Sequence, residues 1–113
     1  MIIISESRKK EDILKNHNHF FKTLIKGVVD LEKSILALDA ELHADLEQSL
    51  LEKGSQQNNL WGINLYLDRP KEEWIEYTAL INIRPSMGNN GMEVEDQQTR
   101  EKINQIVYKL IEF

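Results

Sequence analysis

The segment LDAELHADLE, residues 38–47, places two aspartates, two glutamates and one histidine within ten residues. Carboxylate oxygens and imidazole nitrogens are ligands for divalent cations, and a histidine tuned by a nearby carboxylate can act as a general acid or base. Alternate residues of a strand share a face, so an extended backbone would align four of these side chains: Asp39, Glu41, His43 and Asp45. A helix would instead divide them between two faces.

The backbone that must position these side chains belongs to residues 28–53, which contain neither glycine nor proline. Leucine and isoleucine recur at three- and four-residue spacing from Leu31 to Leu50, and the composition favours a helix. Between positions 36 and 47, however, apolar residues alternate with the others, which favours a strand. The residues alone leave both structures open.

Three segments, VVDLEKSILALDAELHAD, LEKGSQQNNLWGINLY and INIRPSMGNN, resemble a family of short bacterial proteins of unknown function. The series ELHAD … LWG … INIRPS carries this resemblance over nearly the whole chain. The resemblance implies glycines in related chains near positions 34 and 38 to 40, which suit a turn and cost a helix about 1 kcal/mol each. It therefore favours a hairpin turning at residues 32–34, followed by a strand over residues 35–45. It implies no activity.

The remaining elements are predicted from periodicity and caps. Three isoleucines at 2–4 predict a strand, and an apolar stripe predicts a helix over 8–25 that ends at Gly27. Residues 60–67 and 74–84 alternate with period two and predict antiparallel strands. A second apolar stripe, capped by Asp96, predicts a helix over 97–112.

These elements predict an α+β fold in one domain, residues 1–113, with an antiparallel meander sheet and two amphipathic helices packed on one face. The opposite face would then be bare and polar. Its candidate ligand-binding residues are Glu41, His43, Asp45, Asn64, Tyr66, Asn82, Arg84 and Ser86. They could bind a cation, or hold an anion on Arg84 with Asn82 and Ser86 donating. A plain solvated face is the alternative, because antiparallel sheets commonly have one, and we assign neither a metal nor a catalytic residue.

Two further motifs could bind ligands. His17 and His19 on one helix diverge by about 200°, so they would not chelate a common ion; we expect His17 to pack and His19 to be solvated. The loop RPSMGNNG, residues 84–91, could present backbone N–H groups to an anion, or it could be a plain connection. It lacks the glycine spacing and lysine of a phosphate-binding loop.

Composition narrows the class of protein. The formal charge of −5 argues against nucleic acid as a partner, and the absence of cysteine excludes disulfides and thiolate metal sites. No apolar run approaches the roughly 20 residues that span a bilayer, so we expect a soluble cytoplasmic protein without a membrane partner.

The expected function is a small binding or interaction module that uses the polar sheet face. Trp74 and Leu80 predict a contact surface on that face, which a two-fold homodimer would bury. The alternative is a small metal- or acid–base-dependent enzyme centred on His43, Glu41, Asp45 and Arg84, and neither its cofactor nor its ligand follows from the sequence.

Overall fold

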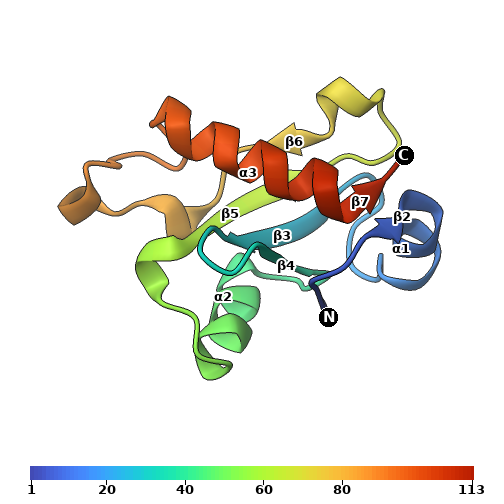
Figure 1. The fold of residues 1–113 in the computed structure, drawn as a ribbon, viewed down its shortest axis with the longest axis horizontal. Coiled ribbons are helices and arrows are strands. Elements are labelled where there is room, and N and C mark those ends of the chain that lie inside the picture. The colour runs from blue at the N-terminus through green and yellow to red at the C-terminus, as the bar shows by residue number, and fades with distance from the viewer.

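A computed structural model describes residues 1–113 and has an α+β fold, in which helices lie on both sides of a five-stranded antiparallel sheet (Figure 1). The strand order is β1-β4-β3-β5-β6. These strands are β1 (Ile2–Ile4), β3 (Ile25–Asp30), β4 (Ile35–Leu38), β5 (Leu60–Leu65) and β6 (Ile75–Glu76). A separate parallel pair joins β2 (Arg8–Lys9) to β7 (Ile111–Glu112).

Three α-helices and four short 3-10 helices connect the strands. The α-helices are α1 (Lys10–Asn16), α2 (His43–Glu52) and α3 (Gln97–Leu110). The 3-10 helices are η1 (Gln57–Asn59), η2 (Lys71–Glu73), η3 (Leu80–Asn82) and η4 (Pro85–Met87). None of the helices has the length and apolar character that crossing a bilayer demands.

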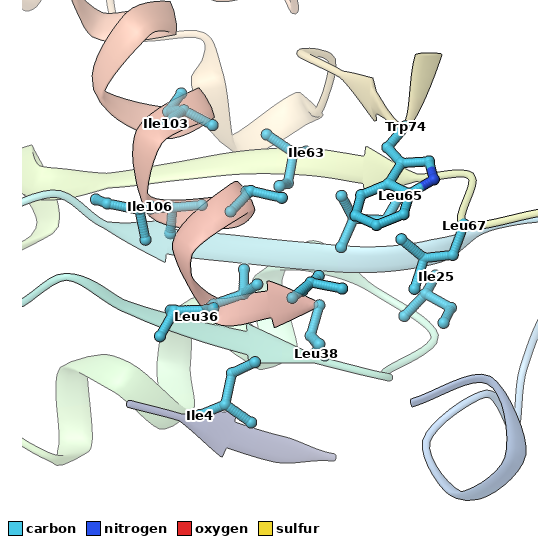
Figure 2. Packing of buried hydrophobic residues seen from close by; sticks show 14 of the residues in the cluster. Ile4, Ile25, Leu36, Leu38, Ile63, Leu65, Leu67, Trp74, Ile103 and Ile106 are labelled. Carbon is cyan, nitrogen blue, oxygen red and sulfur yellow. The ribbon is translucent and has the colours of Figure 1, made fainter. Parts of the chain in front are cut away.

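The first face of the sheet is covered by α3. The Asp96 carboxylate accepts a hydrogen bond from the Thr99 N–H at 2.9 Å and caps the helix, as predicted. Ile103 and Ile106 project from α3 onto Leu36 and Ile63 of the strands (Figure 2). This first-face core comprises 17 buried residues, among them the fully buried Trp74. The predicted contact surface at Trp74 is therefore wrong, because its indole lies in the core.

The hairpin predicted at residues 32–34 is confirmed. Asp30, at the end of β3, accepts hydrogen bonds from the Glu32 and Lys33 N–H groups, each at 2.9 Å. Ser34 adopts a positive φ of 54° and completes the turn into β4. The Ser55 hydroxyl donates to the same Asp30 carboxylate at 2.7 Å, which ties the loop after α2 to the hairpin.

The strand predicted over residues 35–45 is wrong beyond Leu38. Asp39 has a left-handed backbone with φ 73°, which ends the extended conformation, and α2 begins four residues later at His43. Leu46 and Leu50 follow the helical spacing and are buried against the second face of the sheet. The four acidic and histidine side chains of residues 39–45 therefore do not share a strand face.

The helix predicted over residues 8–25 is also wrong, because α1 ends at Asn16 and only its Ile13 is buried. The Asp39 carboxylate accepts the backbone N–H of His19, which fixes the chain in a non-helical path towards β3. Gly27 lies inside β3 rather than after a helix. A side chain there would come within 3.1 Å of Leu38 Cδ2, so glycine permits close packing on the first face.

Two helices on a single face are likewise not confirmed. Alternate residues of a strand point to opposite faces: Val29 packs in the first-face core, whereas Val28 packs with Leu46 and Leu50 of α2. The second face is therefore not bare, but its core contains only six buried residues. It is the sparsely covered side of the sheet.

Candidate functional site

The second face holds a close junction between β5 and the segment that follows β6. A Cβ atom added at Gly62 would come within 2.5 Å of Ala79 Cβ, 3.1 Å of Ile81 Cγ1 and 3.3 Å of His43 Cδ2. Such a short carbon–carbon distance would force a shift of the backbone. Glycine at position 62 therefore lets η3 and the start of α2 lie directly on the strand.

Asn82 stabilises this junction through hydrogen bonds of its side chain. Its Oδ1 accepts the Gly62 N–H at 2.8 Å, and its Nδ2 donates to the Gly62 carbonyl at 3.0 Å. The same Nδ2 also donates to the Met92 carbonyl at 3.1 Å. Because Asn82 is fully buried and its side chain is bound to backbone groups, it is not available to donate to an anion, which was one of the alternatives.

His43 links α2 to the same strand. Its Nε2 lies 2.8 Å from the Ile63 carbonyl oxygen, and because a carbonyl can only accept, Nε2 carries the proton. Burial lowers the pKa of His43 from its ordinary 6.5; the Lys26 charge lowers it further, while the hydrogen bonds to Ile63 and Asn64 oppose the shift. The neutral imidazole therefore joins the start of α2 to strand β5.

Arg84 is engaged in an ion pair. Its Nη2 donates to Glu47 Oε2 at 3.0 Å, and the two side chains are only 10% and 14% exposed. The guanidinium carbon lies 5.1 Å from the centre of the Trp61 ring. Burial lowers the pKa of Arg84, and the Glu47 carboxylate opposes that shift. The partner of Arg84 is thus Glu47 on α2 rather than Glu41 or Asp45.

A groove of about 410 Å³ opens beside the junction, where α2 leaves the second face uncovered. Its apolar rim carries Leu80, Leu42 and Met92, which are 70%, 53% and 42% exposed. Its lining residues are Leu24, Lys26, Leu42, His43, Ala44, Asn64, Thr78, Ala79, Leu80, Ile81 and Met92. The hollow has the size of a ligand or side-chain pocket, and we call it the α2–η3 groove.

The predicted site residues are only partly brought together. His43 and Asn64 both line the α2–η3 groove. Asn64 donates to Glu76 Oε1 at 2.7 Å, and the Tyr66 hydroxyl donates to the same oxygen at 3.3 Å. The other three predicted side chains are exposed and make no side-chain hydrogen bond: Glu41, Asp45 and Ser86. No three histidine, aspartate or glutamate side chains lie close enough together to hold a metal ion.

The Asp39 carboxylate is buried, whereas the predicted strand would have placed it on the bare polar face of the sheet. It accepts hydrogen bonds from the backbone N–H and from Nδ1 of His19, and lies 3.9 Å from the Met1 amino group. Burial by itself would raise the pKa of Asp39, but the two His19 hydrogen bonds and the nearby positive charges bring it below its ordinary 3.8. His19 is therefore bound through one nitrogen rather than fully solvated.

The loop of residues 84–91 uses its amides internally. The buried Asn89 side chain donates to the carbonyls of Asn82, Gly91 and Glu93 and accepts the Glu95 N–H. Glu95 in turn accepts the N–H groups of Asn90 and Gly91, both at 2.9 Å. The backbone donors that could have faced an anion are thus bound to a carboxylate of the same chain.

The structure is thus an α+β fold whose second sheet face is built around a glycine and a buried asparagine. The chain belongs to the family "Protein of unknown function (DUF5674)", whose model matches residues 2–110. No curated protein and no solved structure matches the chain. The segments ELHAD, LWG and INIRPS meet at this junction through His43, Gly62 and Asn82.

Proposed function

We propose that this protein is a small interaction module that uses the α2–η3 groove to bind a second copy of the chain. The observation that carries the proposal is the concentration of exposed apolar side chains on the groove rim, led by Leu80. Large apolar residues gathered at one surface hollow mark interaction sites more often than scattered ones do.

The charges of this surface favour a copy of the same chain as the occupant. Lys26 lines the groove, while the exposed Glu76 is bound to the groove residue Asn64. A two-fold axis brings the same patch of both copies together. It can therefore set the ammonium of one copy near the carboxylate of the other, while each Leu80 enters the opposite groove.

The geometry does not favour an enzyme centred on His43, Glu41, Asp45 and Arg84. The imidazole Nε2 is bound to a backbone carbonyl, and the guanidinium is paired with Glu47. The Glu41 and Asp45 side chains are exposed and unbonded. His43 and Arg84 thus make structural contacts, while Glu41 and Asp45 face solvent, so the four groups do not converge on a reacting atom.

The oligomeric state tests the proposal. We expect sedimentation equilibrium at micromolar concentration to give the mass of two chains for the wild type and of one chain for Leu80→Ser, because the substitution removes the apolar side chain that enters the opposite groove. The matched control is Phe20→Ser, which changes an exposed apolar residue outside the groove lining and should remain a dimer. A wild-type monomer, or a dimer unaffected by Leu80→Ser, would overturn the proposal.

A further inference from the structure

Two adjacent asparagines in the loop before α3 have opposite environments. Asn89 is buried, and all its side-chain groups are hydrogen-bonded. Asn90 is exposed, its side chain makes no hydrogen bond, and the next residue is Gly91. The chain therefore presents one free carboxamide directly before a residue that has no side chain.

We propose that Asn90 is a self-modification site, which closes to a cyclic imide with Gly91 and opens to aspartate or isoaspartate. The attacking and attacked groups belong to neighbouring residues, so the reaction gains the rate advantage of an intramolecular step. Gly91 has no side chain, so it adds no steric hindrance at the nucleophile. The proposal is independent of the α2–η3 groove.

The reaction needs only water as a co-reactant. The Gly91 nitrogen loses its proton and forms a bond to Asn90 Cγ, and the tetrahedral carbon then expels its amino group, which takes up a proton and leaves as ammonia. Water opens the five-membered imide at either carbonyl. Opening at one carbonyl gives aspartate, and opening at the other gives isoaspartate, whose main chain is one carbon longer. Either product places a new carboxylate at position 90.

Glu95 is placed to accept the proton. Its Oε2 lies 2.9 Å from the Gly91 nitrogen, within the range required of a general base. It also binds the Asn90 N–H at 2.9 Å, which fixes the carboxylate beside the reacting pair. The new carboxylate would then repel Glu95, so modification should loosen this turn.

Peptide-mapping mass spectrometry of the folded protein, incubated at mildly alkaline pH, tests the site. We expect the mass increase of amide-to-acid conversion at residue 90, with both aspartate and isoaspartate products, and none at residue 89. The control Asn90→Ser should abolish the increase. Gly91→Ala should slow it severalfold; a Cβ at that position lies 3.6 Å from the nearest atom, Glu95 Oε2, and can be accommodated.

Two results would overturn the inference. The first is an unmodified Asn90 in the folded chain under conditions in which a synthetic peptide of residues 86–95 is converted. The second is a faster conversion at another asparagine than at Asn90. Glu95→Gln keeps an oxygen acceptor but is a far weaker base, so the rate should fall severalfold; an equal or faster rate would overturn the role of Glu95.

Discussion

The two faces of the sheet are built by different means. The first face is closed by α3 through apolar contact, with Ile103 and Ile106 lying on the strands. The second face has a much smaller apolar core under α2, and its remaining cover is held by side-chain hydrogen bonds and one ion pair. Hydrogen bonds and an ion pair can therefore hold the covering segments on a sheet where little apolar area is buried. They leave a groove that an apolar core would have filled.

The largest effect should come from Asn82→Ala, which breaks the second face. The substitution leaves the buried Gly62 N–H and Gly62 carbonyl without a partner, whereas the Met92 carbonyl keeps its hydrogen bond from the Ala79 N–H. Each unsatisfied buried group costs about 1–3 kcal/mol, so we expect the free energy of unfolding to fall by about 4 kcal/mol in chemical denaturation.

Hydrogen exchange distinguishes this effect from a general loss of stability. In Asn82→Ala the amides of residues 77–95 should exchange faster than those of α3. The matched variant of the first face, Ile103→Ala, should lose about 3 kcal/mol through a cavity and should accelerate exchange in α3. If both variants gave the same exchange pattern, the two faces of the sheet would not be stabilised independently.

A smaller effect is expected from Gly62→Ala. The added methyl group would overlap Ala79 Cβ and push η3 from the strand, and overpacking of this kind costs about 1–3 kcal/mol. Gly91→Ala is the control, because its new Cβ meets only an ordinary contact and should change stability by no more than about 0.5 kcal/mol. Equal melting temperatures for the two variants would contradict close packing at Gly62.

The smallest effect should be a pH dependence at His43. Burial lowers the pKa of His43 in the folded protein, so the unfolded chain binds a proton at this residue first as the pH falls below 6.5. The free energy of unfolding should therefore decrease from pH 6.5 down to the folded-state pKa, and His43 should not affect it above pH 6.5. Denaturation midpoints should therefore show a shallower slope in this window for His43→Gln than for the wild type. Asp39, whose pKa is lowered, acts in a separate window, since its contribution is lost only below about 3.8. An unchanged slope in His43→Gln would contradict the buried, neutral imidazole.

Sequence periodicity predicted the elements that face a single large core. The helix of α3 and the strand β5 were found because their apolar residues repeat without interruption. The hairpin at residues 32–34 was found through the resemblance to related chains. α2 was missed: alternation and helical spacing coincide between Leu36 and Leu46, so the residues left both structures open, and the resemblance wrongly favoured a strand. The change of conformation occurs at Asp39, which has a left-handed backbone and whose carboxylate is bound to the distant His19.

The site was harder to predict than the fold for a related reason. His43 and Asn64 do line one groove, but their neighbours Leu42, Leu80 and Met92 come from three separate segments. Asn82 appeared to be an exposed ligand residue because strand alternation was continued through a segment that is a 3-10 helix. Periodicity reports which side of an element is apolar, and it cannot report that a carboxamide will bind a backbone twenty residues away.

The pairing of Asn82 with Gly62 has a consequence for how sheets extend. A carboxamide presents the same acceptor and donor as a peptide unit, so Asn82 occupies the position of one more strand along the outer side of β5. β6 pairs with β5 only at Asn64 and Leu65, and the edge beyond it would otherwise be available at Gly62 to any extended polypeptide. One amide side chain thus terminates the sheet at Gly62, where a further strand could otherwise pair.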